Sequence, residues 1–341
     1  MKLKVGSYLR GNILDLVSGT TTDPVVIKNA SSYELKVPDF FENQSIEDEK
    51  NLEQASTFIQ NSFRSQKLSE QETNIVIPDE QCSLQIIKLP LVSEKEIISA
   101  IELQSEEFVP YPIEKASFDY QVLSVNKQNN TMYLLLVVAL KEDIDKASNL
   151  LLNMGLYPVG LETETTALIR ILLNNHLKLQ DKFSMLINIG NGSTQITILN
   201  VEQKQLVTTN SVNVGNQFFY KALQNNLNIP SNTAKEMFNT LKPEDLNYQK
   251  IIKPVFAEYA KQIQKILMSA LEKIGTLPTR VYLYSSQIAG SYQLLFKDHP
   301  MLQQYNTVNL NTITSEQTDI KFPEALKTKL GYYLVPLGAI I

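Results

Sequence analysis

The chain has 341 residues, 43% of them hydrophobic and 20% charged, which is typical of a soluble globular protein and favours two lobes over a single core. The net charge of −5 argues against a nucleic-acid partner, because such a partner requires a basic surface. The single cysteine, Cys82, excludes a disulfide framework and indicates a reducing compartment.

The N-terminal residues lack the apolar core of a signal peptide. The longest apolar run, Met132 to Leu140, is far shorter than the roughly 20 residues of a membrane helix. The two histidines, His176 and His299, are far apart and lack the spacing of metal ligands. We therefore expect a cytoplasmic protein without a metal site, which reaches a membrane only through a partner.

Residues 1–37 alternate apolar and polar side chains, which predicts a meander of short strands with turns at Gly11-Asn12 and at Ser18-Gly19-Thr20. An acidic, polar link over residues 39–50 follows. Apolar residues that include Phe58 then recur at helical spacing over 51–63 and predict an amphipathic helix.

Residues 84–160 follow the order strand, helix, two strands, helix, strand, which predicts a compact α+β module inserted within a larger lobe. Ser93 and Glu96 form a capping box that opens the first helix. The expected elements are strands at 84–89, 117–125, 131–140 and 157–161, and helices at 94–108 and 141–154.

An apolar run from Phe183 breaks at Gly190-Asn191-Gly192-Ser193-Thr194 and resumes as an alternating strand to Leu199. Asn-Gly between two strand-like runs predicts a β-hairpin, because both residues tolerate positive φ. A glycine-rich loop with hydroxyl side chains also presents backbone N–H groups that can bind a phosphate. These residues alone leave two interpretations open, an ordinary type I′ hairpin and a phosphate loop.

The remaining pattern predicts mostly helices around two strands. The expected elements are helices at 162–177, 216–227, 233–241 and 253–274, a strand at 205–214 ended by Gly215, a strand at 281–285 followed by a helix from Ser286-Gln287, and a closing apolar helix at 325–341 interrupted at Pro336.

Several stretches carry a resemblance to a known family. They are Glu106-Glu107-Phe108-Val109-Pro110-Tyr111-Pro112-Ile113-Glu114, Phe118-Asp119-Tyr120-Gln121-Val122-Leu123, Leu89-Pro90, Val138-Ala139 and Gly155-Leu156-Tyr157-Pro158-Val159. Together with the order of the elements, they resemble the PilM family of type IV pilus assembly proteins, which belongs to the actin-like ATPases. The resemblance covers essentially the whole chain.

The resemblance implies an α/β fold of the two-lobed actin-like type, a duplicated ribonuclease-H-like fold with an inserted α+β module. The implied divisions are lobe I over 1–83, 161–182 and 325–341, the module over 84–160, and lobe II over 183–324.

By the same resemblance, the hairpin is the family's second phosphate loop, with Gly190, Asn191, Gly192, Ser193 and Thr194 facing the nucleotide. Asn188 stands where the family usually has the aspartate that holds magnesium, and an amide lacks the charge that this cation prefers.

The first phosphate loop aligns with Lys4-Val5-Gly6-Ser7, where Lys4 replaces a metal-binding aspartate.

Further changes fall near the adenosine. Ser285-Ser286 replaces paired glycines, and the Cβ atoms obstruct a close approach. Gly215 is kept while Asn216 replaces its neighbour, and Lys235-Glu236 only loosely matches an acidic residue and a lysine of the family. We therefore expect weak ATP binding at most, no firm magnesium site and no catalytic residue.

The resemblance also implies partners. The family grips the N-terminal cytoplasmic tail of a PilN-like bitopic membrane protein in a groove beside the inserted module, and other platform components and the pilus motor are further expected partners. An extended peptide can add to an exposed strand edge. Phe108, Tyr111 and Tyr120 are the candidate pocket residues. Phe108 and Tyr120 fit a role in the module core better, whereas Tyr111, flanked by prolines, is the better candidate for exposure.

The alternative is an active magnesium-dependent ATPase that switches the pilus platform. It would need Asp15, Glu162, Glu164 or Asp181 to replace the missing carboxylates. A sugar kinase is disfavoured because no aspartate has a catalytic context. A membrane-bound cell-division actin homologue is disfavoured because the C-terminal residues have no basic face.

Overall fold

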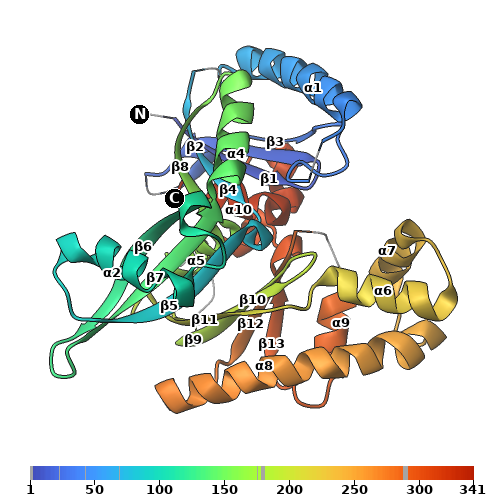
Figure 1. Cartoon of the computed structure of the whole chain (residues 1–341). Coiled ribbons are helices and arrows are strands. Elements are labelled where there is room, and N and C mark those ends of the chain that lie inside the picture. Colours follow the sequence, from blue (N-terminus) through green and yellow to red (C-terminus); the bar gives the residue numbers. More distant parts are fainter. Residues whose placement is uncertain are drawn as a thin grey trace. The chain divides into compact units, whose positions relative to one another are not determined.

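The computed structural model describes residues 3–22, 24–42, 44–68, 70–174, 176–177, 181–286 and 291–341. The chain forms two compact units, Met1–Lys178 with Ile313–Ile341, and Leu179–Thr312. Each unit contains a five-stranded sheet (Figure 1). The three-part division drawn from the sequence, with residues 84–160 as a module of its own, stays a prediction.

In the first unit the strands are β1 (Lys4–Arg10), β2 (Ile13–Thr20), β3 (Val26–Glu34), β4 (Glu72–Ile77), β5 (Cys82–Pro90), β6 (Ala116–Asn126), β7 (Thr131–Leu140) and β8 (Tyr157–Thr163). Its helices are α1 (Ile46–Ser65), α2 (Ile97–Leu103), α3 (Ser105–Phe108), α4 (Lys141–Asn153), α5 (Glu164–Leu173) and α10 (Leu334–Gly338).

In the second unit the strands are β9 (Phe183–Ile189), β10 (Thr194–Asn200), β11 (Gln205–Val212), β12 (Arg280–Ser285) and β13 (Asn306–Asn309). Its helices are α6 (Asn216–Leu227), α7 (Ser231–Thr240), α8 (Lys253–Ile274) and α9 (Ser291–Asp298).

The two five-stranded sheets share one topology, with the strand orders β3-β2-β1-β4-β8 and β11-β10-β9-β12-β13. In each sheet the first three strands of the chain pair antiparallel. The first strand then pairs parallel with the fourth, and the fourth pairs parallel with the fifth. This repetition confirms the predicted duplication of a ribonuclease-H-like sheet.

A third sheet, with strand order β5-β7-β6, belongs to the first unit. One face of β7 carries Met132, Leu134, Leu136 and Val138, which pack in a buried core with Ile97 and Ile101 of α2. The side chains of β7 alternate between the two faces of the sheet, so Leu135, Val137 and Ala139 point to the opposite face. The predicted capping box of Ser93 and Glu96 is confirmed.

Three local predictions are wrong. Ser18-Gly19-Thr20 is not a turn but the end of β2, where Gly19 lets β3 approach, because a Cβ there would lie 2.5 Å from the carbonyl oxygen of Val26. Helix α1 begins at Ile46 within the predicted acidic link, since Ser45 and Asp48 form a capping box. Phe58 is 70% exposed and does not belong to the buried face.

Two predicted helices also differ in the structure. The helix expected at 94–108 is divided into a short 3₁₀ turn, α2 and α3, because the N–H of Gln104 bonds the carbonyl of Ile101, only three residues back. The closing helix is a 3₁₀ segment, Glu324–Tyr333, followed by α10. Pro336 does not interrupt α10, since it lies in the first turn, where a helix needs no N–H donor.

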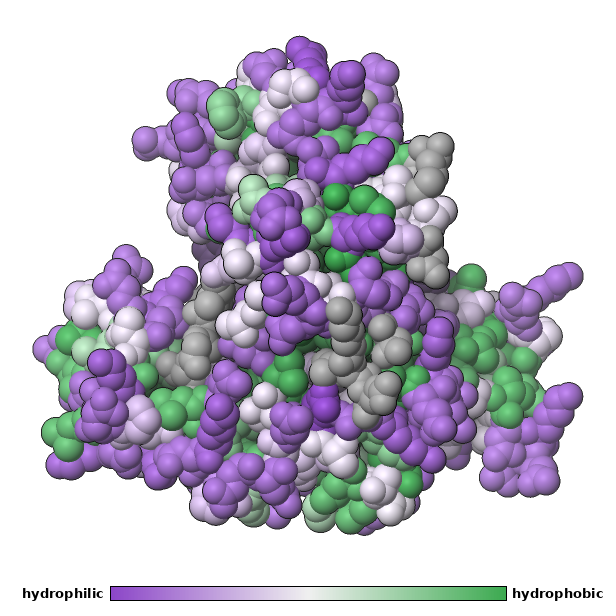
Figure 2. Space-filling view, turned by 180° about the vertical axis from the view of Figure 1, so that it is seen from behind, coloured by the Kyte–Doolittle hydropathy of each residue, from purple (hydrophilic) through white to green (hydrophobic). Residues whose placement is uncertain are grey.

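The helix expected from Ser286-Gln287 falls largely outside the described residues, and α9 begins at Ser291. Among the helices that the structure describes, none has the length and apolar character required to span a membrane. Figure 2 shows hydrophilic side chains over most of one face, with apolar ones in small patches among them.

Candidate functional site

The glycine-rich stretch of the second unit forms the predicted β-hairpin between β9 and β10. Gly190 donates its N–H to the carbonyl of Ser193, over 2.9 Å, which closes the loop. The start of α6 then donates back to this loop, from Asn216 to the carbonyl of Gly190 and from Gln217 to that of Asn191, over 3.0 and 2.9 Å. The first N–H groups of α6 are therefore directed at protein carbonyls.

Gly215 serves the same contact. A Cβ at this position would lie 2.4 Å from the carbonyl oxygen of Asn191 and 2.7 Å from that of Gly190, so only glycine allows α6 to begin against the loop. Thr194 is fully buried and donates its hydroxyl to the carbonyl of Val214, over 2.6 Å. Packing within the second unit therefore explains why Gly215 and Thr194 occupy these two positions.

Asn216 and Ser285, which the resemblance predicts to stand in place of glycines, bond to each other. The side-chain amide of Asn216 donates to the hydroxyl of Ser285 over 3.1 Å, and its carbonyl oxygen accepts the hydroxyl of Tyr292 over 2.8 Å. The backbone of Ser285 exchanges two hydrogen bonds, of 3.0 and 2.9 Å, with the side chain of Asn311. All four residues are buried, so their side chains fill the space between α6, α9 and the end of β12.

The prediction of a first phosphate loop at Lys4–Ser7 is wrong, because these residues lie inside β1. The hydroxyl of Ser7 is fully buried and donates to the carbonyl of Asn74. A Cβ on Gly6 would lie 2.0 Å from the carbonyl oxygen of Pro336, so this glycine serves the packing of α10 on β1. The turn of this hairpin is the predicted Gly11-Asn12.

The other predicted nucleotide residues are spread through the second unit. Asn188 is buried near the end of β9, beside β10 and β12. Lys235 and Glu236 are exposed on α7, and Ser286 is half-buried after β12. Within the described ranges, no three His, Cys, Asp or Glu side chains lie together so that they could hold a metal ion.

The four carboxylates that an active ATPase would have to recruit each bond another side chain. The partners are Arg10 for Asp15, Arg170 for Glu162, Tyr8 for Glu164 and Arg280 for Asp181.

The first unit contains a groove of about 460 Å³ beside the three-stranded sheet. Its floor includes Leu135, Val137 and Ala139 on the face of β7 opposite α2, and Ile144 of α4 also lines it. One wall is β6 over residues 117–121, and the opposite wall is formed by β8 and α5 over residues 161–170. Among the described strands β6 pairs only with β7, so the groove runs along an open sheet edge.

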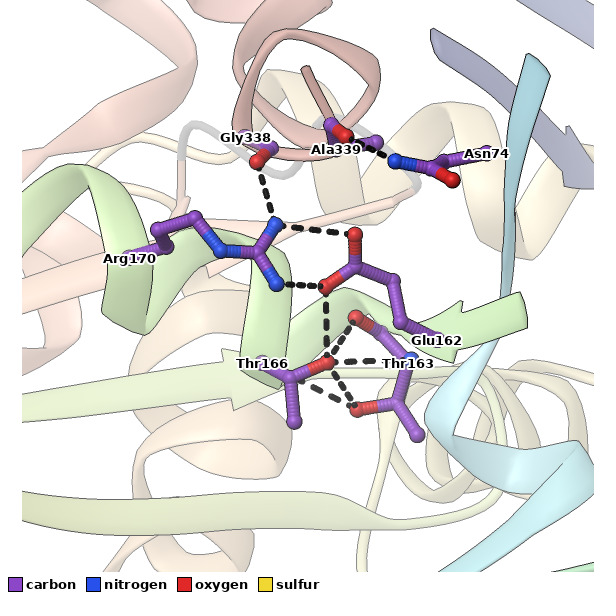
Figure 3. Close-up of polar contacts among 7 residues, drawn as sticks. All are labelled: Asn74, Glu162, Thr163, Thr166, Arg170, Gly338 and Ala339. Atoms are coloured by element: carbon purple, nitrogen blue, oxygen red, sulfur yellow. Dashed lines mark hydrogen bonds and ion pairs between the residues drawn. The ribbon is translucent and has the colours of Figure 1, made fainter. Parts of the chain in front are cut away.

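The wall of α5 and β8 is polar and internally bonded (Figure 3). Arg170 bonds both carboxylate oxygens of Glu162, over 2.9 and 2.8 Å, in the two-point geometry that guanidinium and carboxylate favour. The hydroxyl of Thr166 lies 3.3 Å from the same carboxylate. The guanidinium also donates to the carbonyl of Gly338 in α10.

The three candidate aromatics do not converge on this groove. Phe108, Tyr111 and Tyr120 are all half-buried against the core on the other face of the sheet. Of these, Tyr120 also lines the groove, as part of β6. Tyr111, the better candidate for exposure, is half-buried like the other two, and burial raises the pKa of its phenol above the ordinary value.

The groove floor could have been found from the sequence. Residues 132–139 belong to the longest apolar run of the sequence, so both faces of this strand are apolar. Such a strand needs a cover on both sides. Helix α2 covers one face. On the other face Ala139 packs in a core with Ala147 and Leu151 of α4, and Leu135 and Val137 remain for the groove. No local sequence pattern indicated that Glu162 and Arg170 would form an ion pair in the groove wall.

The sequence matches the family described as "Type IV pilus assembly protein PilM" over residues 28–271, which is more than half of the chain. The chain belongs to the PilM family. Its structure is similar to one described as "PilM-PilN type IV pilus biogenesis complex", with a TM-score of 0.75, 19% identity, and coverage of 99% of this chain and 97% of that chain.

A second similar structure is the ethanolamine utilization protein EutJ from Carboxydothermus hydrogenoformans, with a TM-score of 0.52, 14% identity, and coverage of 98% and 90%. No curated protein matches the chain. These likenesses confirm the predicted α/β actin-like fold of this PilM family member.

Proposed function

We propose that this PilM family member is a scaffold of the type IV pilus assembly platform, which binds the N-terminal cytoplasmic tail of a PilN-like membrane protein in the groove along β6. The observation that carries the proposal is this groove, with an apolar floor, polar walls and an open strand edge. Family membership and the likeness to a structure described as a PilM–PilN complex support it.

The groove suits an extended peptide. Backbone groups of β6 at the sheet edge can pair with a peptide strand, while alternate peptide side chains enter the apolar floor. Its volume of about 460 Å³ is large enough for a few side chains. In this proposal the protein works in the cytoplasm at the inner membrane face, held there by its partner, and other platform components or the pilus motor bind elsewhere on it.

The nucleotide site is proposed to be degenerate. Asn216 and Ser285 fill, with a mutual hydrogen bond, the space that the family keeps open with glycines. The first hairpin has a tight turn and no glycine-rich loop, and Asn188 supplies no charge for a cation. The residues present therefore do not fit magnesium-ATP, and we assign no hydrolytic step to this chain.

The test is a titration of the partner's N-terminal tail peptide, labelled with a fluorophore, against the full chain. Val137→Arg places a long charged side chain on the groove floor and is expected to abolish binding. The matched control is Val122→Arg, because Val122 is 42% exposed on β6 outside the groove lining, and this variant should bind normally. Equal binding by wild type and Val137→Arg, with both folded by circular dichroism, would refute the site.

A further inference from the structure

The last carbonyls of the C-terminal segment, residues 334–341, accept hydrogen bonds from three different elements. Arg170 of α5 donates to Gly338, and Asn74 of β4 donates to Ala339 over 2.7 Å (Figure 3). Lys4 of β1 donates to Ile340 over 3.0 Å. Carbonyls at a helix end have no partner within the helix, and positive side chains there interact favourably with the negative end of the helix dipole. These donors therefore hold the segment in place.

Only one of these three donors also lines the groove. Arg170 is part of the groove wall, with 37% of its side chain exposed, whereas Asn74 and Lys4 are not among the lining residues. The same guanidinium holds Glu162, whose side chain is 15% exposed and lines the groove next to it. The polar wall is therefore continuous, through Arg170, with the carbonyl of Gly338.

The contact between α10 and α5 leaves little room for independent movement. A Cβ on Gly338 would lie 2.3 Å from the carbonyl oxygen of Ala167, which lies one turn before Arg170 in α5. Close-packed interiors transmit displacements instead of absorbing them. A shift of the C-terminal segment therefore moves the carbonyl that orients Arg170, and with it the position of Glu162 in the wall.

We infer that Arg170 is a positioning residue that couples binding in the groove to the order of the C-terminal segment. The inference rests on the proposed function, because it takes the partner's tail peptide as the occupant of the groove. A coupling free energy between two sites acts equally in both directions: each site changes the equilibrium at the other by the same factor. The segment held in place strengthens peptide binding, and peptide binding in turn lowers the equilibrium population of the open segment by the same factor.

The first measurement is amide hydrogen exchange of residues 334–341 in the full chain, with and without saturating tail peptide. The peptide is expected to slow exchange in this segment about tenfold in the wild type. In Arg170→Lys the charge remains, but a lysine cannot bond Glu162 at two points and Gly338 together. This variant should bind the peptide about tenfold more weakly, and the bound peptide should no longer slow exchange at 334–341.

The second measurement separates coupling from direct contact. Asn74→Ala removes a bond to the C-terminal segment without touching the groove lining, and it should weaken peptide binding severalfold. Arg64→Lys, at an exposed arginine in the last turn of α1, is the matched control and should change nothing.

The outcomes are distinguishable. Peptide binding that leaves exchange at 334–341 unaltered, or an Asn74→Ala variant with wild-type affinity, would overturn the coupling and leave the proposed function standing. A wild-type chain that does not bind the peptide would overturn both.

Discussion

Asn216 and Ser285, 69 positions apart in the sequence, are joined by a buried hydrogen bond of 3.1 Å. The same asparagine accepts the hydroxyl of Tyr292, and burial raises the pKa of that phenol further above its ordinary value. In the PilM resemblance both positions are glycines near the nucleotide. The two substitutions thus form one polar contact that closes the space, and this contact contributes to the stability of the second unit.

Asn216→Ala is expected to lower the free energy of unfolding of the second unit by about 2–4 kcal/mol, because it leaves the buried hydroxyls of Ser285 and Tyr292 without this partner. Urea unfolding followed by circular dichroism measures the change. Asn226→Ala on the same helix is the control, since Asn226 is exposed and bonds only a carbonyl of its own helix. Equal losses in the two variants would show that the buried contact has no special role.

The filled space also predicts the response to nucleotide. Calorimetric titration of the wild type with magnesium-ATP is expected to show no binding tighter than about 1 mM, and phosphate release should not exceed the buffer blank. The side chains of Asn216 and Ser285 obstruct the approach of the nucleotide, and Asn188 offers the magnesium ion no negative charge. Tight, metal-dependent binding with turnover would favour the ATPase instead.

The sequence predicts best those elements whose signals are local. Helix α8 has its predicted bounds, because apolar residues recur at helical spacing and Gly275, with φ +71°, ends it. Asn216 begins α6 where predicted, directly after Gly215. The prediction of a loop at Gly6 is wrong, because this position needs a glycine to make room for the carbonyl of Pro336, 330 positions away. No local sequence pattern records such a distant contact.

The candidate site was predictable only in part for the same reason. The apolar run of β7 is visible in the sequence, but the packing of α2 decides which of its faces is covered. Arg170 and Glu162 acquire their place in the groove wall through the turn from β8 into α5, and the bond to Gly338 depends on the chain returning from the second unit. These are tertiary relationships, which override local propensity.

Two glycine substitutions test the packing of α10. Gly338→Ala is expected to destabilise the first unit by about 2–3 kcal/mol, because its Cβ would meet the rigid backbone of Ala167 at 2.3 Å. Gly160→Ala is the matched comparison, since its Cβ would meet the side-chain oxygen of Asn74 at 3.0 Å, a smaller overlap that a shift of a few tenths of an ångström relieves. Thermal unfolding should therefore show a clearly larger loss for Gly338→Ala, and the reverse order would contradict this packing.

The position of Tyr111 predicts a loss of stability without a loss of binding. Tyr111→Ala removes a half-buried ring from the core behind the sheet and should cost about 2 kcal/mol. The affinity of the folded variant for the partner's tail peptide should stay within about twofold of the wild type, because Tyr111 does not line the groove. A selective loss of affinity at unchanged stability would instead place Tyr111 in the binding site.

The pH dependence of stability is expected to depend on His299. Burial lowers the pKa of this imidazole below its ordinary value of about 6.5. Below about pH 6.5 the imidazole is therefore protonated in the unfolded chain while it is still largely neutral in the folded chain. The stabilising contribution is therefore present above about pH 6.5 and is lost as the pH falls toward the lowered value. The neighbouring Asp298 stays ionised in this window, since its hydrogen bond from Lys253 lowers its pKa.

His299→Phe isolates this contribution, because phenylalanine keeps an aromatic ring beside Phe256, whose centroid lies 5.8 Å from that of the imidazole. Urea midpoints measured from about pH 8 to about pH 5 should fall more steeply for the wild type than for the variant. His176 is present in both proteins, so the comparison isolates the change at His299. Parallel curves would mean that His299 titrates alike in the folded and unfolded chain, and its burial would then have no energetic consequence.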